Sequence, residues 1–361
     1  MNNRIGVGIL GANPDRSWAA LAHIPAIQAS PDFTLAAVAT TRTESARAAR
    51  DRFGARHAFT DPVSLARHPD VDLVVVNVKV SAHAELVTAG LDAGKHVYCE
   101  WPLGLNLAEA ETLDEAAAKA GVHAVVGLQA RFAPAVTRAR AMISDGALGT
   151  IVSATLYSAR GKGSTLDVPA WTAYTYDAAG KAGLVEVLGG HALDLVRHLL
   201  GPVRAITART AIRSPRHRVA ETGEPVPVTA ADQLLAIVEL GSGAVVSFHV
   251  HDSEAAAPRS RLEISGTAGS LALTSAPEAD PWASQLQIGR LDLHAARPGQ
   301  VPWTRVALGD DEAAVPVAAA NVARLYRQLA ADLRDGTRHA PSFRDACDVH
   351  ALIEQIPARD R

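Results

Sequence analysis

The sequence has few cysteines, few aromatic residues and no long apolar run. Two cysteines, Cys99 and Cys347, are too few for a disulfide framework and favour a reducing compartment, so we expect a cytoplasmic protein. Aromatic residues make up only 4% of the chain, and the group Trp171, Tyr174 and Tyr176 therefore stands out. No apolar run reaches the roughly 18 residues that a membrane-spanning helix needs, and the N-terminus lacks a signal-peptide layout.

Neither sign of charge dominates the sequence. The formal net charge is −3, and acidic and basic residues are mixed throughout, whereas a nucleic-acid-binding surface needs a basic stripe. We therefore expect no direct nucleic-acid partner and no membrane association. A length of 361 residues with 48% apolar residues predicts a globular protein of two domains.

The first part of the chain alternates short apolar runs with helical patterns. This alternation predicts a doubly wound parallel sheet of the Rossmann type over residues 1–127. The expected strands are Ile5–Leu10, Phe33–Ala39, His57–Thr60, Leu73–Val78, His96–Glu100 and His123–Gly127. The expected helices are Trp18–Gln28, Thr43–Phe53, Ala82–Ala93 and Leu107–Ala120. A glycine directly follows each of the last three, and the first stops near Ser30-Pro31.

The second part of the chain has consecutive strands without helices between them. This predicts an α+β domain with a large, mainly antiparallel sheet over residues 128–361. Its expected strands are Ile151–Ser158, Ala205–Ile212, Gln233–Leu240, Ala244–His251, Arg261–Ser265, Ser270–Thr274, Leu286–His294 and Thr304–Leu308. Helices are expected over Ala318–Leu333 and Phe343–Ile356, and the last could pack back on the first domain; residues 213–229 are expected to form a surface loop.

The turn after the first strand is the candidate phosphate-binding loop. A literal G-x-G-x-x-G at residues 6–11 lies inside the strand, whereas the loop must follow the strand and open a helix. The better match is Gly11-Ala12-Asn13, which leads toward a helix at Trp18. We expect Gly11 to make the tight turn and the free helix N–H groups to bind a pyrophosphate. Asn13 stands where a second glycine is usual, and Asn tolerates left-handed backbone angles better than most residues. An ordinary strand–turn–helix junction is the alternative.

The end of the second strand indicates which dinucleotide would bind. An NAD site places an acidic residue there for the ribose 2′-hydroxyl, whereas an NADP site uses a nearby arginine for the 2′-phosphate. The sequence continues Thr40-Thr41-Arg42 and has no acid before Glu44, which favours NADP over NAD. The alternative for Arg42 is a solvated surface residue.

Several segments, taken in order, resemble the Gfo/Idh/MocA oxidoreductase family over nearly the whole chain. They are the Gly11 turn, Leu73–His83, Ala93–Leu103, Gly189–Asp194 and Phe343–Ala346. Leu128–Arg131, Tyr174–Asp177 and Glu100-Trp101 are most similar to the branch of a yeast repressor of galactose genes. The resemblance implies a Rossmann domain followed by an open-faced sheet, oxidation or reduction of sugars and related alcohols with NAD(P), and a homo-oligomer, either dimer or tetramer.

Two residues depart from the family pattern. Family enzymes have Glu-Lys-Pro where this chain has Glu100-Trp101-Pro102, and an aspartate where it has Val187. The indole N–H of Trp101 is a donor only and cannot take a proton. His191 remains as the candidate general acid or base, since its unperturbed pKa lies near 6.5.

Other candidates follow from their positions along the chain. Tyr176 and Lys181 lie in the loop region before His191 and could donate a proton in place of the family lysine. Lys79 follows a central strand at the edge where open α/β sheets bind ligands. The remaining candidate cofactor contacts are Ala12, Trp18, Thr41, Val78, His83, Glu100, Trp101 and Gln129.

Two functions from different classes remain open. One is an NAD(P)-dependent oxidoreductase with a sugar-like or other small alcohol or carbonyl substrate. The other is a catalytically silent dinucleotide-binding sensor or transcriptional regulator that acts through protein contacts. We expect no metal site, since the histidines are dispersed and His249-x-His251 has no evident third ligand, and no nucleophile elbow indicates a hydrolase.

Overall fold

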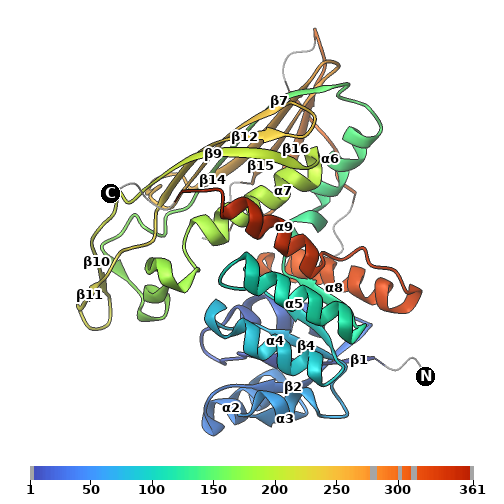
Figure 1. The fold of residues 1–361 in the computed structure, drawn as a ribbon, viewed down its shortest axis with the longest axis vertical. Helices are drawn as coiled ribbons and strands as arrows, with labels where there is room; N and C mark the ends of the chain where they lie inside the picture. Colours follow the sequence, from blue (N-terminus) through green and yellow to red (C-terminus); the bar gives the residue numbers. More distant parts are fainter. Residues whose placement is uncertain (1–3, 277–282, 300–302, 310–314, 358–361) are drawn as a thin grey trace. The chain divides into compact units, whose positions relative to one another are not determined.

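The computed structural model describes residues 4–276, 283–299, 303–309 and 315–357. The chain forms two compact units (Figure 1). The first, the N-terminal unit, comprises Met1–Gln129 and Ala313–His350; the second, the sheet unit, comprises Ala130–Glu312 and Ala351–Arg361. Within the described ranges, every helix is too short or too polar to cross a membrane.

The N-terminal unit contains the expected parallel sheet. Its six strands are β1 (Ile5–Leu10), β2 (Phe33–Ala39), β3 (His57–Phe59), β4 (Leu73–Val76), β5 (His96–Cys99) and β6 (Ala124–Val126). They lie in the order β3-β2-β1-β4-β5-β6, and all neighbours are parallel. The direction of the strand order reverses between β1 and β4, and open α/β sheets bind ligands at such a switch point. The Rossmann prediction is therefore confirmed.

The helices of this unit begin and end largely where local signals place them. They are η1 (Ala19–His23), α1 (Ile24–Gln28), α2 (Thr43–Phe53), α3 (Pro62–Ala66), η2 (Val80–Ala82), α4 (His83–Asp92) and α5 (Leu107–Ala120). Gly54 and Gly121 end α2 and α5 with φ angles of 72° and 69°, a region that glycine enters without steric cost. At the other end of α5, the Asn106 side chain accepts a hydrogen bond from the Glu109 N–H. Helices α4 and α5 pack side by side (Figure 1).

Two late helices, α8 (Val317–Asp335) and most of α9 (Phe343–Ile353), group with the N-terminal unit. Helix α8 packs on η1 and α1, and its buried Tyr326 contacts the rings of His23, Phe33 and Tyr98. The Val126 N–H also donates to the Pro341 carbonyl at 2.9 Å. The compact units thus differ from the expected continuous division at residues 127/128, because aromatic packing and pairing beside β6 hold residues 313–350 to the first unit.

The sheet unit is built on eight strands, which confirms the mainly antiparallel sheet. They are β7 (Ile151–Ala159), β9 (Val203–Ala211), β12 (Gln233–Leu240), β13 (Val245–His251), β14 (Arg259–Gly266), β15 (Ser270–Ser275), β16 (Leu291–Ala296) and β17 (Thr304–Arg305). The order is β17-β16-β15-β14-β7-β13-β12-β9, and only β7 and β13 are parallel neighbours. Helices α6 (Pro134–Ser144) and α7 (Gly190–Leu200) run along this sheet and contribute to its apolar core (Figure 1).

The segment expected as a loop over residues 213–229 is partly ordered into strands. Strands β10 (His217–Val219) and β11 (Pro225–Val226) join β8 (Asp167–Val168) in a small sheet, packed around Val168, Tyr176 and Val226. Strands of two or three residues are too short to show an alternating pattern. Two other expected strands are shorter than predicted: residues 286–290 precede β16 as turns, and β17 ends at Arg305.

Candidate functional site

The loop after β1 makes the turn predicted for Gly11. Gly11 has a φ angle of +91°, and a Cβ atom there would lie 2.0 Å from the Asn77 carbonyl oxygen. Asn13 does not adopt the left-handed backbone that it would tolerate; in the described part of the chain, only Lys181 does so among non-glycine residues. Instead, the Asn13 Oδ1 accepts hydrogen bonds from the N–H groups of Asp15 (2.9 Å) and Arg16 (3.2 Å). The side chain of Asn13, rather than its backbone, therefore shapes the loop.

The helix after this loop begins as a π turn at Ala19, directly after Trp18. π turns are rare and occur frequently at functional sites. The N–H group of Ala20 donates to the Ser17 hydroxyl at 3.1 Å. Because Ser17 accepts the Ala20 N–H, one N–H group fewer is free at the helix N-terminus to bind a phosphate. The helix still follows the Gly11 turn, as a phosphate-binding loop requires.

Thr41 and Arg42 lie exposed at the carboxyl end of β2. The Arg42 carbonyl accepts hydrogen bonds from the hydroxyls of Thr40 and Ser45, both at 3.0 Å, which fixes the backbone at the start of α2. In the described ranges, the Arg42 guanidinium forms no ion pair. The nearest acid along the chain, Glu44, belongs to the first turn of α2. This corner of the site therefore suits an anionic group.

His83 ties together the loops that follow β4 and β5. Its Nδ1 lies 2.8 Å from the Pro102 carbonyl oxygen, and its Nε2 lies 3.2 Å from the Val78 carbonyl oxygen. Burial lowers the pKa of His83, so the imidazole is neutral and donates one of these bonds. The role of His83 is positional, whereas Lys79 on the same loop is exposed.

Glu100 and Trp101 follow β5 and differ in their surroundings. The Glu100 Oε1 accepts a hydrogen bond from His23 at 3.0 Å, and a Cβ on Gly127 would lie 2.8 Å from that oxygen. Trp101 is 5% exposed, and its ring lies 4.7 Å from the His350 ring. The buried indole therefore fills the position of the family lysine by packing, and it has no basic atom.

Gln129, at the end of the N-terminal unit, has a buried amide oxygen without a hydrogen-bond partner among the described residues. A buried acceptor without a partner costs free energy unless a ligand or water supplies the donor. Together with the Gly11 turn and the open Arg42 corner, this atom shows that the residues present fit a dinucleotide. The loops that carry them follow strands β1, β2 and β6 of one parallel sheet, and therefore lie at the same carboxyl edge.

His191 lies in the sheet unit, at the second residue of α7. The helix is preceded by a π turn, η6 (Val185–Gly189), which carries Val187 at the position of the family aspartate. His191 is 5% exposed, and its Nδ1 has no partner among the described residues. Burial, and then the nearby Arg160 cation, lower its pKa to about 3. With this lowered pKa, His191 is a neutral imidazole at physiological pH.

Tyr176 and Lys181 are engaged in separate contacts. The Tyr176 hydroxyl donates to the Lys162 carbonyl at 3.2 Å, and burial raises its pKa to about 12. The Lys181 Nζ lies 3.7 Å from Glu186 Oε1, and its side chain is 45% exposed. The amine near Tyr176 is that of Lys162, which the sequence did not single out.

Arg160 and Asp252 form a bidentate ion pair, which the sequence also did not indicate. The Arg160 Nε lies 2.5 Å from Asp252 Oδ1, and its Nη2 lies 2.9 Å from Oδ2. Both residues follow parallel neighbours, β7 and β13, whose last residues, Ala159 and His251, are paired. Adjacent parallel strands place the residues after their ends together, but that pairing could not be read from the sequence.

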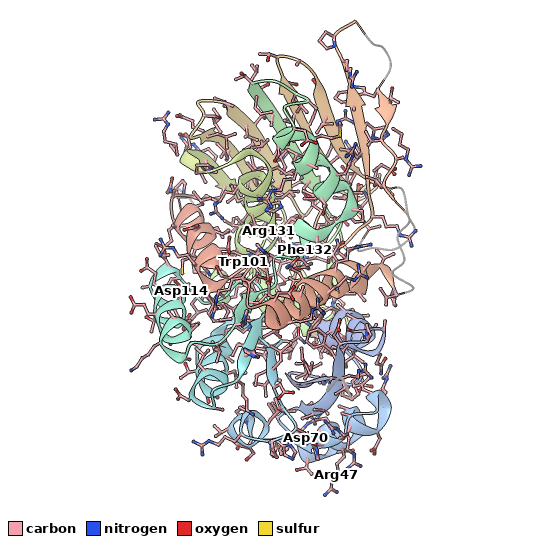
Figure 2. The ribbon with its side chains drawn as sticks, turned by 90° about the vertical axis from the view of Figure 1, so that its right-hand side faces the viewer. Arg47, Asp70, Trp101, Asp114, Arg131 and Phe132 are labelled. Atoms are coloured by element: carbon pink, nitrogen blue, oxygen red, sulfur yellow. The ribbon has the colours of Figure 1, made fainter. Side chains whose placement is uncertain are left out.

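His57, His68 and Asp70 form a cluster with metal-ligand chemistry in the N-terminal unit. One ligand atom of each lies within 4.8 Å of the others. The Asp70 carboxylate is already shared by His57 Nε2 at 2.8 Å and Arg56 Nη1 at 3.4 Å. Asp70 precedes β4 and lies at the end of this unit opposite Trp101 (Figure 2), so the cluster is remote from the candidate nucleotide loops.

Comparisons with known proteins agree with this layout. Residues 5–128 match an oxidoreductase family with an NAD-binding Rossmann fold, GFO_IDH_MocA, and residues 136–272 match the C-terminal domain of that family. Dehydrogenase aclE of Aspergillus oryzae is 35% identical over 228 residues, which cover 62% of each chain. The alignment thus spans less than two thirds of that relative.

Solved structures match over nearly the whole chain. A super-repressor mutant of Gal80p from Saccharomyces cerevisiae has a TM-score of 0.85 at 25% identity, covering 98% of this chain and 95% of that one. Levoglucosan dehydrogenase in complex with NADH and levoglucosan has a TM-score of 0.84 at 22% identity, covering 98% and 96%. The same architecture therefore occurs in a regulator and in a sugar dehydrogenase.

Proposed function

Because the chain belongs to the GFO_IDH_MocA oxidoreductase family, we propose that it transfers a hydride between NADP and a sugar-like or other small alcohol or carbonyl substrate. The observation that carries this proposal is the shared edge of the parallel sheet. The loops after β1, β2, β5 and β6 lie at this edge, and they carry the Gly11 turn, the exposed Arg42 and the buried Gln129 amide oxygen. When bound, the nicotinamide would accept or supply the hydride, and the protein would position the substrate and handle one proton.

The preference for NADP rests on Arg42. Its guanidinium forms no ion pair within the described residues, and the strand end carries hydroxyl groups instead of the carboxylate that binds a ribose 2′-hydroxyl. A 2′-phosphate would give the arginine a charge-assisted partner. Residues 11–13 and the start of η1 would bind the pyrophosphate, and Gln129 would accept a hydrogen bond from the nicotinamide end. Trp101 would form an apolar wall.

His191 is proposed to bind the substrate oxygen as a neutral imidazole. Its buried Nδ1 has no partner in the described part of the chain, so an incoming hydroxyl would satisfy it. A neutral ring orients a hydroxyl well, but with a pKa near 3 it holds a proton poorly. His191 is therefore better suited to orientation than to storing the proton.

The open face of the large sheet is proposed to bind a second copy of this chain. Leu235, Ile237 and Val245 are 54%, 54% and 43% exposed there, although their strands, β12 and β13, have neighbours on both sides. Exposed apolar side chains grouped on one face of a sheet indicate that another protein surface covers this face. Two buried, unpaired cysteines favour a reducing compartment, and we propose the cytoplasm.

A direct test follows the absorbance of reduced nicotinamide with a panel of sugars, polyols and small aldehydes. We expect turnover with at least one of them, and His191→Ala should reduce turnover at least about tenfold without changing dinucleotide affinity. Unchanged turnover would remove His191 from the reaction. Tight dinucleotide binding without turnover on any compound would contradict the enzyme.

That second outcome would favour a dinucleotide-binding regulator. The specific observation behind this alternative is the pair of non-titrating residues, Trp101 and Val187, at the positions of the family lysine and aspartate. A regulator needs the cofactor loops and the protein surface but no proton transfer. Under this alternative, bound NADP would change the affinity for a partner protein, which a pull-down with and without nucleotide would measure.

A further inference from the structure

Lys162 lies in the loop after β7 and is one of only five lysines in the sequence. Its Nζ donates to the Thr175 hydroxyl at 2.5 Å and lies 4.9 Å from the centre of the Tyr176 ring. The Thr175 hydroxyl donates its own proton to the Thr172 carbonyl at 2.6 Å. Thr175 can therefore only accept from Lys162, and this fixes the amine on one side.

The nearby acid does not neutralise Lys162. Both oxygens of Asp252 are held by Arg160, at 2.5 and 2.9 Å. The Gly163 N–H donates to the Asp252 carbonyl at 2.7 Å, which anchors the loop beside that ion pair. Among the described residues, no carboxylate lies within ion-pair distance of the Lys162 amine. Thr175 accepts one of the N–H groups of the amine, and the nitrogen lies over the Tyr176 ring.

The surroundings of Lys162 favour its neutral form. Burial, and then the neighbouring Arg160 cation, lower its pKa to about 8, although Asp252 opposes the shift. Two neighbouring groups change charge far from neutral pH: the pKa of His191 is lowered to about 3, and that of Tyr176 is raised to about 12. His217, whose ring packs on Tyr176, and His251, which directly precedes Asp252, are the other titratable side chains nearby. Lys162 is the amine of this cluster, and its pKa lies near the pH at which enzymes work.

We propose that Lys162 is the residue that exchanges a proton with the substrate oxygen, the task for which Trp101 has no basic atom. This inference rests on the proposed oxidoreductase function. In the oxidation, the substrate carbon loses its hydrogen with the bonding electron pair to the oxidised nicotinamide nucleotide, and a C=O bond forms. The hydroxyl proton passes to the neutral amine, which becomes an ammonium and then releases the proton to water. The reduction runs through the same steps in reverse.

The arrangement also assigns the neighbours a positioning role. Thr175 directs the amine by accepting one N–H, and the Tyr176 hydroxyl fixes the Lys162 backbone through its carbonyl. The Arg160 cation helps to lower the pKa of the Lys162 amine, and Asp252 balances the Arg160 charge in an ion pair. An oxidation rate that needs the neutral amine should therefore rise with pH through about 8.

The first experiment needs no turnover. Reductive methylation with formaldehyde and cyanoborohydride, followed by peptide mass spectrometry, measures the reactivity of each lysine against pH. The other four lysines, Lys79, Lys95, Lys119 and Lys181, serve as internal references. We expect a reactivity midpoint near pH 8 for Lys162. A midpoint of 10 or higher for Lys162 would overturn the inference.

The second experiment compares Lys162→Met, Lys162→Arg and the matched control Lys119→Met, whose lysine is exposed at the end of α5. With a substrate that the wild-type protein oxidises, Lys162→Met should lower kcat about 10²–10⁴-fold. The oxidation rate of this variant should no longer rise with pH near pH 8. Lys162→Arg should not restore the rate, because arginine stays charged. NADPH affinity and the melting temperature show whether each variant folds.

A Lys162→Met protein that keeps the wild-type rate and pH profile would overturn the role of Lys162 and leave the oxidoreductase function standing. Absence of turnover in the wild-type protein would instead contradict the proposed function itself. The labelling midpoint would then still show whether the Lys162 amine loses its proton near pH 8.

Discussion

The Tyr326 hydroxyl donates to Nδ1 of His23 at 3.0 Å, across 303 positions of the sequence. The other ring nitrogen of His23 lies 3.0 Å from Glu100 Oε1. His23 and Tyr326 are fully buried. The chain of bonds connects α8 to η1 and to the residue after β5, and so it holds the start of the first helix beside the loop that carries Trp101.

Tyr326→Phe is expected to lower the free energy of unfolding by about 1–3 kcal/mol, because it leaves the buried His23 Nδ1 without a donor. Urea unfolding measures this loss. In a double-mutant cycle with His23→Ala, the two losses should not add, because both changes break the same bond. Strictly additive losses would mean that the contact contributes nothing beyond packing.

Arg42→Ala is expected to weaken NADP binding at least about tenfold, because a hydrogen bond to a charged group contributes about 1.5–3 kcal/mol. NAD binding should change little, since NAD lacks the 2′-phosphate. Isothermal titration with both nucleotides measures the ratio, and Arg47→Ala, on the next turn of α2, is the control. Equal losses for NADP and NAD would contradict the assignment.

Lys162→Met is expected to stabilise the sheet unit at pH 7. The folded pKa of Lys162 is about 8, below its usual value of 10.5, so the unfolded chain binds more protons between these two values. The stability of the wild-type protein should therefore rise as the pH increases from 8 to 10.5, and it carries the full penalty below 8. The variant should gain roughly 1–2 kcal/mol at pH 7 and lose this pH dependence. Thermal unfolding at pH 7 and pH 9.5 distinguishes the two proteins.

Ile237→Glu, alone or with Leu235→Glu, is expected to dissociate the proposed oligomer, because a charge buried in an apolar interface is costly. Light scattering after size exclusion would report the mass. Since both side chains lie on the open face of the sheet, the melting temperature of the separated chain should change little. A wild-type monomer at micromolar concentration would exclude this interface.

The fold was predictable where local signals act alone. Helix α5 covers the residues predicted for it, Leu107–Ala120, because Asn106 caps one end and Gly121 supplies the left-handed residue at the other. Strand β4 is shorter than the expected Leu73–Val78: it ends at Val76, and the carbonyl of the next residue, Asn77, lies close to Gly11. Apolar content cannot show where a neighbouring loop stops a strand.

The candidate site was predictable only in its cofactor half. Gly11, Arg42 and Trp101 follow strands that are evident in the sequence, so their shared edge could be inferred. Lys162 gave no such signal, because its partner Thr175 is 13 positions away and the Arg160–Asp252 pair spans 92. The lowered pKa of His191 depends on burial and on Arg160, which are properties of the folded chain.

The chain leaves the N-terminal unit after Gln129 and returns to it for α8 and α9. During synthesis, the parallel sheet therefore emerges before residues 130–312 of the sheet unit, whereas Tyr326 reaches the ribosome exit only after them. Until then the first half exposes the surface around His23 and Phe33 that α8 later covers. The N-terminal unit would thus begin to fold before the sheet unit and be completed after most of it, and its apolar surface would stay exposed in between.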